Sequence, residues 1–371
     1  MKKVLMTGVA LSFGMAIAAT AALADINVAA VGPMTGQYAA FGEQLKRGAE
    51  MAVAEINEAG GVNGEKLALT IGDDACDPKQ AVAVANDLAS KKVVFVDGHF
   101  CSGSSIPASA VYAEENIIQI SPASTNPKFT DERPGKGTMR VVGRDDAQGI
   151  VAGNFLAKNF KDKKIAILDD KSPYGKGLAD ETRKSLNAAG VTEALNESYT
   201  AGEKDYTALV SKMKAANIDV VYVGGYHTEG GLILRQMRDQ GMTAPMVSGD
   251  AFNTTEFWTI TGPAGEGMIF TFAPDPRNNP AAADVVKKFK DQGYDPEGYT
   301  LYSYVAMKLW AEAVTRAGGT DFDKVVDELG KTDADTAVGK IRFNDKGDIQ
   351  DATYVWYKWS NGNYAEDPSV Q

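Results

Sequence analysis

The chain has 371 residues, of which 38 are Lys or Arg and 49 are Asp or Glu, so its net charge is −11 with His neutral. Hydrophobic residues make up 44% and charged residues 23%, which is typical of a globular protein with apolar material for one large core or two medium cores. The acidic charge argues against a nucleic-acid or anionic-membrane partner, because both bind basic surfaces.

The N-terminus has the pattern of a secretory signal peptide. Lys2 and Lys3 precede an uncharged run over 4–22, and Ala22-Leu23-Ala24 is a small-x-small cleavage site. We therefore predict cleavage after Ala24 and export of the remaining chain. The alternative, a membrane anchor that stays attached, fits less well because the run is rich in Ala and Gly and only weakly apolar.

Strand-like and helix-like segments alternate in the first half of the chain. Gly60-Gly61 ends one predicted helix, and Asp77-Pro78 opens another with an N-cap followed by Pro. The predicted order is strand 26–31, helix 43–58, strand 66–72, helix 78–90, strand 93–96, helix 106–115 and strand 117–120. This alternation predicts a parallel sheet with helices on both faces.

The alternation then restarts. The predicted order is helix 146–160, strand 164–168, helices 175–189 and 206–216, strand 220–223, helix 228–240, strands 246–247 and 267–272, helices 281–292 and 300–317, and strand 353–359. This length exceeds one typical domain, so we predict an α/β protein of two lobes, each built on a doubly wound parallel sheet. The segments 143–146 and 272–276 are predicted crossings between the lobes.

The two cysteines, Cys76 and Cys101, form an even pair in an exported protein, which favours a disulfide over a reactive thiol. No C-x-x-C motif is present. Two Cys and two His also argue against a zinc site or an iron–sulfur cluster, and we expect no metal and no cofactor.

Catalytic motifs are absent from the sequence. No G-x-S-x-G nucleophile motif occurs, and Gly135-Lys136-Gly137-Thr138 lacks the earlier Gly of a phosphate-binding loop. His99 and His227 stand outside any recognisable motif, and a lone His is most often structural. We therefore predict that the protein is not an enzyme; a secreted hydrolase that uses His99 or His227 is the alternative.

Polar loops follow the predicted strands at the edge where open α/β sheets bind ligands. The loops 97–105 and 121–127 place hydroxyl and N–H groups at helix N-termini, which suit a carboxylate. Ordinary helix capping by Ser and Thr is the alternative for each loop taken singly. The loops 169–175, 224–229 and 248–252 carry carboxylates and phenol hydroxyls, which suit an ammonium group and an apolar stem.

Six stretches carry a family resemblance: 72–82, 99–102, 121–127, 170–177, 201–206 and 224–226. They resemble the bacterial leucine/isoleucine/valine-binding proteins, the periplasmic receptors of branched-chain amino-acid ABC transporters. The resemblance covers essentially the whole chain after the leader. It implies a periplasmic location and a type I periplasmic-binding fold, in which two lobes joined by three crossings enclose the ligand. The implied segments are lobe I at 25–143 and 274–346, lobe II at 147–271 and 352–371, and a hinge near 144–146, 272–273 and 347–351.

The resemblance also implies roles for individual residues. They are Ser102, the Ala123 backbone and Thr125 for the ligand carboxylate, Tyr226 and Asp250 for the ammonium group, Tyr174 as a cover, and Phe41 and Phe100 as walls. The pair of Cys76 and Cys101 matches the family's disulfide.

Two positions depart from the familiar family pattern. Asp250 stands where Glu is expected, so its carboxylate reaches one methylene less. Phe100 stands where Leu is familiar, and Tyr302 is expected to add bulk nearby. A larger ring takes volume from the ligand, and overpacking costs roughly 1–3 kcal/mol, which favours Ala, Val or another small amino acid over Leu.

We therefore expect the periplasmic solute-binding component of an ABC importer. It would be a monomer that captures a free branched-chain or smaller aliphatic amino acid and delivers it to the inner-membrane permease. A sensor module on the same fold, or a receptor for a related amide or γ-amino acid, is the alternative.

Overall fold

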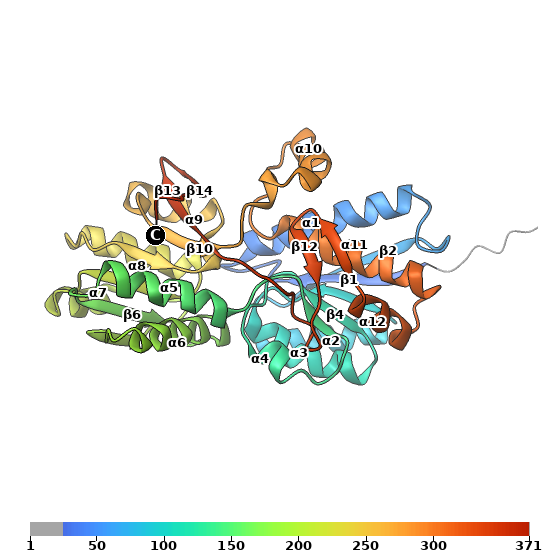
Figure 1. Ribbon diagram of the computed structural model, residues 1–371, viewed down its shortest axis with the longest axis horizontal. Coiled ribbons are helices and arrows are strands. Elements are labelled where there is room, and N and C mark those ends of the chain that lie inside the picture. The colour runs from blue at the N-terminus through green and yellow to red at the C-terminus, as the bar shows by residue number, and fades with distance from the viewer. Residues whose placement is uncertain (1–24, 371) are drawn as a thin grey trace, which may run out of the picture.

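The computed structural model of the protein describes residues 25–370, and the predicted signal peptide over 1–24 lies outside them. Figure 1 shows two lobes side by side, each with helices packed around a β-sheet. The prediction of a two-lobed α/β fold is confirmed. Within residues 25–370, no helix combines the length and the apolar character needed to cross a bilayer.

The first lobe is built on a parallel sheet with the strand order β2-β1-β3-β4-β5. Its strands are β1 (Ile26–Gly32), β2 (Leu67–Asp73), β3 (Phe95–Gly98), β4 (Ile118–Ser121) and β5 (Thr138–Arg140). Successive side chains of a strand point to opposite faces, so neighbouring residues of β1 pack into two different hydrophobic cores. Val28 and Ala30 belong to the core on one face, and Ala29 and Val31 to the core on the other. The unbroken apolar run of this strand therefore reflects burial on both faces.

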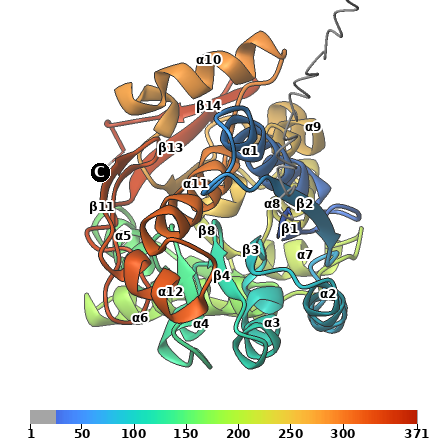
Figure 2. The same ribbon diagram turned by 90° about the vertical axis from the view of Figure 1, so that its right-hand side faces the viewer.

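Helices cover both faces of this sheet. They are α1 (Ala39–Glu58), α2 (Pro78–Ser90), α3 (Ser102–Glu114), α4 (Lys128–Asp131), α10 (Ala283–Asp291), α11 (Thr300–Ala317) and α12 (Phe322–Gly330). The helix pair α1 and α11 lies on one face and the pair α2 and α3 on the other (Figure 2). The Asp77 side chain accepts hydrogen bonds from the N–H groups of Lys79 and Gln80, so α2 begins at Pro78 as predicted. In contrast, α3 begins at Ser102 rather than 106, because the polar residues before 106 form its first turn.

The second lobe contains a seven-stranded sheet with the order β14-β13-β10-β9-β8-β6-β7. Its strands are β6 (Ile165–Asp169), β7 (Leu195–Ser198), β8 (Val220–Gly224), β9 (Met246–Ser248), β10 (Ile269–Phe272), β13 (Val355–Ser360) and β14 (Asn363–Glu366). Its helices are α5 (Asp145–Asn159), α6 (Pro173–Ala188), α7 (Thr207–Ala215), α8 (His227–Asp239) and α9 (Glu256–Thr261).

This second sheet is not wholly parallel, which corrects the sequence prediction. β10 leaves the sheet at Phe272, and β13 enters beside it with Val355 opposite Phe272, so the entering strand must run antiparallel. β14 follows through a tight turn at Asn361-Gly362, where both residues have positive φ. Other short elements were also missed, among them β5, β7, α4, α9, α12 and the hairpin of β11 (Asp333–Thr336) and β12 (Gly339–Arg342).

The chain passes between the lobes three times, after β5, after β10 and before β13. A buried ion pair joins the first and third crossings, with Nε of Arg140 2.8 Å from Oδ1 of Asp348 and 0% and 2% of the two side chains exposed. Nη1 of Arg144 lies 3.0 Å from Oδ2 of the same Asp348. These two crossings are therefore tied together, while the residue boundaries given above for the lobes and the hinge stay a prediction.

Candidate functional site

An enclosed cavity lies between the two lobes. Its lining combines aromatic, small and hydroxyl-bearing residues with one acidic residue: Phe100, Ser102, Ala123, Tyr174, Tyr226, Asp250, Ala251 and Tyr299. Apart from Ala251 and Tyr299, each of these was a predicted ligand residue. The free volume is about 10 Å³, which is the space needed by the centre of one water molecule. A ligand therefore reaches this point only if the lobes or these side chains move.

The first lobe contributes the start of α3 and the loop after β4. Ser102 is the first residue of α3, and its Oγ accepts a hydrogen bond from the N–H of Asn126 at 3.3 Å. Cys101, at the N-cap of α3, makes no side-chain hydrogen bond to the helix, so no capping side chain neutralises the positive end of the α3 dipole. This half of the cavity offers hydrogen-bond donors and a positive helix end without a basic side chain in its lining.

Asp250 supplies the acidic group of the cavity and is 2% exposed. The Tyr174 hydroxyl donates a hydrogen bond to Oδ1 of Asp250 at 2.8 Å, and the Tyr299 hydroxyl donates one to Oδ2. Burial raises the pKa of the Asp250 carboxyl, and these two hydrogen bonds oppose that shift. Tyr299 is the N-cap residue of α11 in the first lobe, so Asp250 is held from both lobes.

A second buried carboxyl, that of Asp145, was not predicted. Asp145 is the first residue of α5 and is fully buried, and its N–H donates a hydrogen bond to the Thr125 carbonyl at 2.9 Å. Burial raises the pKa of Asp145 well above its usual value, and the charge of Asp250 raises it further. Two carboxyls therefore share a region in which a nearby cation would stabilise their ionised forms.

Aromatic rings form the wall of the cavity. The ring centres of Tyr174 and Tyr226 are 5.0 Å apart, and the Phe100 ring meets Tyr299 edge-on at 5.1 Å. Phe41 stacks on Phe100 with ring centres 4.3 Å apart. Phe41, a predicted wall residue, therefore lies behind Phe100 and does not line the cavity.

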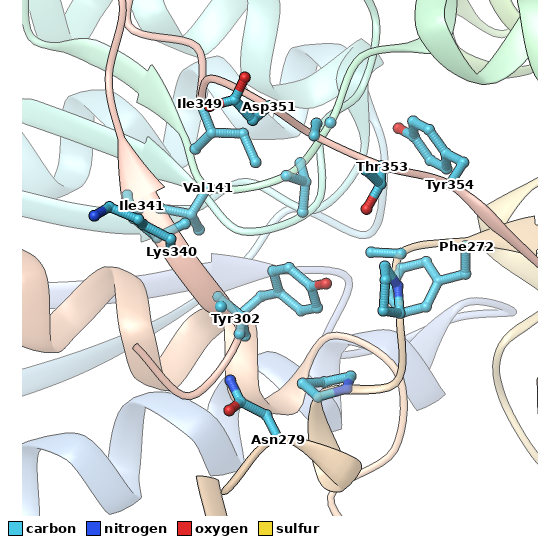
Figure 3. Close-up of a pocket in the computed structure, with 18 of the residues that line it drawn as sticks. Val141, Phe272, Asn279, Tyr302, Lys340, Ile341, Ile349, Asp351, Thr353 and Tyr354 are labelled. Carbon is cyan, nitrogen blue, oxygen red and sulfur yellow. The ribbon is translucent and has the colours of Figure 1, made fainter. Parts of the chain in front are cut away.

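Two other predicted ligand residues, Thr125 and Tyr302, line a larger hollow at the hinge (Figure 3). This hinge pocket has a volume of about 470 Å³ and includes residues of all three crossings, among them Phe272 and Tyr354. Tyr302 lies one turn further along α11 than Tyr299, and this places its ring in the hinge pocket. Tyr299 thus has the position beside Phe100 that was expected for Tyr302.

The hinge pocket is a weaker candidate for the ligand site, although Asp250 and Tyr299 line both spaces. Most of its charged groups are engaged in ion pairs: Asp275 with Arg277, Asp351 with Arg342, and Lys340 with Asp333. The enclosed cavity, in contrast, combines Asp250 with Ser102 at the N-terminus of α3, and Ser102 does not line the hinge pocket.

Side chains of the two lobes also meet beside the cavity. The Tyr38 hydroxyl lies 3.2 Å from Oε2 of Glu229, and Oε1 of Glu229 accepts a hydrogen bond from the N–H of Gly202 at 2.8 Å. The Thr228 hydroxyl donates a hydrogen bond to the Gln37 carbonyl at 2.9 Å. The structure is therefore a closed arrangement, with the start of α8 bonded to the segment before α1.

Neither candidate catalytic base, His99 nor His227, lines the cavity. His99 is fully buried, with Nδ1 2.6 Å from Oδ2 of Asp74 and Nε2 2.9 Å from the Tyr112 hydroxyl. Nε2 of His227 lies 2.8 Å from Oε2 of Glu256. Each imidazole is therefore bonded to side chains outside the cavity.

The predicted disulfide between Cys76 and Cys101 is present, with Cα atoms 5.6 Å apart. It joins the loop after β2 to the loop after β3, next to Ser102. In the part of the chain that the structure describes, no three or more His, Cys, Asp or Glu side chains form a group that could hold a metal ion.

Residues 25–363 match the family model described as periplasmic binding protein. The chain belongs to this family. Its relatives include the Leu/Ile/Val-binding protein homolog 1 of Brucella suis, to which this periplasmic binding protein is 50% identical over 363 residues, covering 98% of this chain and 97% of the relative. An amino acid binding protein of Pseudomonas aeruginosa is 49% identical over 353 residues, covering 94% of each chain.

Solved structures show the same fold as this periplasmic binding protein. The leucine binding protein LivK of Thermotoga maritima has a TM-score of 0.86 at 29% identity, covering 92% of this chain and 97% of LivK. LivJ of Streptococcus pneumoniae, a branched-chain amino acid transporter substrate binding protein solved with isoleucine, has a TM-score of 0.84 at 26% identity, covering 92% of this chain and 99% of LivJ. The fold is therefore that of type I periplasmic binding proteins.

Proposed function

We propose that this periplasmic binding protein captures a free aliphatic amino acid, branched-chain or smaller, between its lobes. The observation that carries the proposal is a buried acidic residue, Asp250, in a cavity whose other half contains Ser102 and the positive end of α3. A zwitterion has the complementary charges, a carboxylate for the helix end and an ammonium group for Asp250. The names of the Leu/Ile/Val-binding relatives and the isoleucine-bound LivJ structure support this ligand class.

The polar residues receive the following roles. We assign the ligand carboxylate to Ser102 and the Ala123 backbone, and the ammonium group to Asp250 and Tyr226. Thr125, which lines the adjoining hinge pocket, stays a predicted ligand of the carboxylate. Charge-assisted hydrogen bonds of roughly 1.5–3 kcal/mol each offset the desolvation of the zwitterion.

The aromatic wall sets the size of the ligand. Phe100 is backed by Phe41, and Tyr299 closes the space that Tyr302 was expected to fill. Because the rings of Phe100 and Tyr299 occupy space that a long ligand side chain would need, we propose a preference for small aliphatic amino acids such as Ala or Val over Leu.

Binding works by hinge closure in this proposal. The assigned residues lie in both lobes, so the ligand stabilises the closed arrangement selectively; equal affinity for the open and closed arrangements would shift nothing. Tyr174 closes over the ligand from the second lobe. The segments near 144–146, 272–273 and 347–351 act as the hinge between lobe I (25–143 and 274–346) and lobe II (147–271 and 352–371).

The closed protein then delivers the amino acid to the inner-membrane permease of an ABC importer. We place the protein in the periplasm as a monomer, after cleavage behind Ala24. Two alternatives share this fold. A sensor module would bind a receptor in place of the permease, and a receptor for an amide or a γ-amino acid would bind that compound in place of an aliphatic amino acid. A hydrolase has no support from the site, because both imidazoles are bonded outside the cavity.

A thermal-shift screen tests the proposal. The purified protein is heated with each of the twenty amino acids, with small amides and with γ-amino acids. A ligand that binds only the folded state, at about 100 times its Kd, adds about 2.7 kcal/mol of stability, so small aliphatic amino acids should raise the melting temperature. A shift produced only by amides or γ-amino acids, or by no compound in the panel, would contradict the proposed ligand class.

A further inference from the structure

The loops after β2 and β3 are cross-linked twice. The disulfide joins Cys76 to Cys101, and a hydrogen bond of 2.6 Å joins Oδ2 of Asp74 to Nδ1 of His99. Each link spans 25 residues of sequence. The second link therefore lies two residues before the first on both loops and connects the same two segments without a covalent bond.

The Asp74 and His99 link is fully buried and its polar atoms are bonded. Both side chains are 0% exposed. Oδ1 of Asp74 accepts a hydrogen bond from the N–H of Cys76 at 2.8 Å, and Nε2 of His99 lies 2.9 Å from the hydroxyl of Tyr112 on α3. A carboxylate only accepts hydrogen bonds, so Nδ1 of His99 carries the proton of this bond. The link thus fixes the ring of His99 from two sides.

The backbone carbonyl of His99 connects this link to the loops after β3 and β4, which form the proposed carboxylate site and are called the ligand loops below. This carbonyl accepts hydrogen bonds from the hydroxyls of Ser121 at 2.7 Å, Ser105 at 3.1 Å and Ser124 at 3.3 Å. These three serines are buried. Ser105 belongs to the first turn of α3, and Ser121 and Ser124 flank Ala123. The position of His99 therefore governs both parts of the proposed carboxylate site.

We propose that Asp74 and His99 are positioning residues that hold the ligand loops in place without the disulfide. On this proposal, the chain with reduced cysteines already has a binding-competent site, and oxidation adds a second, parallel link. The part of the proposal that concerns affinity rests on the proposed function. The part that concerns loop order does not.

The test crosses two changes in the full-length exported protein. Asp74→Ala removes the non-covalent link, and the double substitution Cys76→Ala with Cys101→Ala removes the disulfide. Calorimetry measures the binding of L-alanine and L-valine. Each change alone should weaken this binding by no more than about threefold, because either link can replace the other. The combination should weaken it by about thirtyfold or more. Amide hydrogen exchange over 99–105 should likewise accelerate only in the combination.

The conservative variant separates positioning from a general loss of stability. In Asp74→Asn, the amide N–H of the new side chain can donate a hydrogen bond to Nδ1 of His99. The proton of the imidazole then sits on Nε2, which donates to the Tyr112 hydroxyl, so the link survives. In the cysteine-free protein, Asp74→Asn should therefore keep affinity within about fivefold and retain slow exchange over 99–105. Melting temperatures identify any variant that fails to fold.

Asp73→Asn is the matched control. Asp73 neighbours Asp74, but its carboxylate bonds to Met34, Thr35 and Ala75 and not to the loop after β3. The effect of Asp73→Asn on affinity and on amide exchange over 99–105 should be the same with and without the disulfide.

The proposal is wrong if the cysteine-free protein loses affinity and slow amide exchange over 99–105 while Asp74 is intact. It is also wrong if the effects of Asp74→Ala and of the cysteine substitutions on affinity simply add. If the unsubstituted protein binds neither amino acid, the proposed preference for small side chains fails, and hydrogen exchange alone decides on positioning.

Discussion

The hydroxyl group of Tyr299 donates a hydrogen bond to Oδ2 of Asp250, and the two residues belong to opposite lobes. Tyr174 donates to the other carboxylate oxygen from the second lobe at 2.8 Å. Asp250 is therefore both the acidic group of the cavity and a contact that joins the lobes. In the proposed function, the ligand's ammonium group competes with, or adds to, these donors, so ligand recognition and closure would depend on the same carboxylate.

Phe100→Leu should shift the amino-acid preference towards larger side chains. The substitution removes a ring that lines the cavity between Phe41 and Tyr299. Relief of overpacking should raise the affinity for Leu relative to Ala by about fivefold to tenfold, measured by calorimetry with both amino acids. Tyr302→Leu is the control, because Tyr302 lines the hinge pocket, and the Leu-to-Ala ratio should not change. A larger change in this ratio for Tyr302→Leu than for Phe100→Leu would reverse our assignment of the wall.

Ligand binding should release protons. Burial raises the pKa of the carboxyls of Asp250 and Asp145, so in the ligand-free protein they remain partly protonated above the usual Asp pKa of about 3.9. These groups stabilise the ligand-free fold most at low pH, and that contribution is lost as the pH rises through their raised pKa values. An ammonium group favours the ionised forms, so affinity should fall as the pH is lowered.

Calorimetry in buffers of different ionisation enthalpy measures this proton release directly. The apparent enthalpy of binding should vary with the buffer, and Asp145→Asn should reduce that variation. A binding enthalpy that is independent of the buffer, together with an affinity that does not change between about pH 4 and pH 7, would contradict the involvement of these carboxyls.

Tyr38→Phe should speed up ligand release. Tyr38 and Glu229 lie on opposite lobes with Tyr38 Oη 3.2 Å from Oε2 of Glu229, so the hydroxyl contributes to the closed arrangement. A hydrogen bond to a charged group contributes about 1.5–3 kcal/mol at most, and we expect the dissociation rate in stopped-flow to rise about threefold to tenfold. Glu229→Gln tests the same contact from the other lobe. The two substitutions together should have less effect than the sum of each alone, and full additivity would argue that the contact does not stabilise closure.

Asp348→Asn should strongly destabilise the fold. Asp348 is 2% exposed and pairs with Arg140 and Arg144. Its neutralisation leaves the buried guanidinium of Arg140 without its carboxylate partner, whereas Arg144 keeps Asp131 and Asp146. Loss of one member of a buried ion pair costs about 3–5 kcal/mol in the free energy of unfolding, measured by urea denaturation. Lys340→Gln breaks an exposed pair with Asp333 and should change this free energy by less than about 1 kcal/mol. Equal effects of the two substitutions would show that the hinge ion pair is not important for stability.

Local signals in the sequence predicted much of the fold. The Asp77-Pro78 pair correctly marks the start of α2, and the helical spacing over 300–317 matches α11 at both ends. The polar loops at the strand ends contain most of the residues that line the cavity, because the carboxyl ends of parallel strands meet at one edge of each sheet.

Other features depend on contacts that local patterns do not contain. Tyr299 and Tyr302 are three residues apart, and only the position of the start of α11 against the second lobe decides which of them reaches Asp250. The Tyr38 and Glu229 contact joins positions 191 residues apart. The antiparallel direction of β13 follows from its entry beside the end of β10, which an isolated apolar run does not reveal.

Calorimetry of Asp250→Asn with L-alanine, L-valine and L-leucine tests the central claim most directly, with Asp250→Glu as the matched control that keeps the charge. We expect the unsubstituted protein to bind at least one of these amino acids, and loss of the carboxylate to weaken that binding by about tenfold to a hundredfold or more. Asp250→Glu should retain more affinity than Asp250→Asn. Equal affinity of the unsubstituted protein and a folded Asp250→Asn variant would contradict the claim that this carboxylate binds the ammonium group of the ligand.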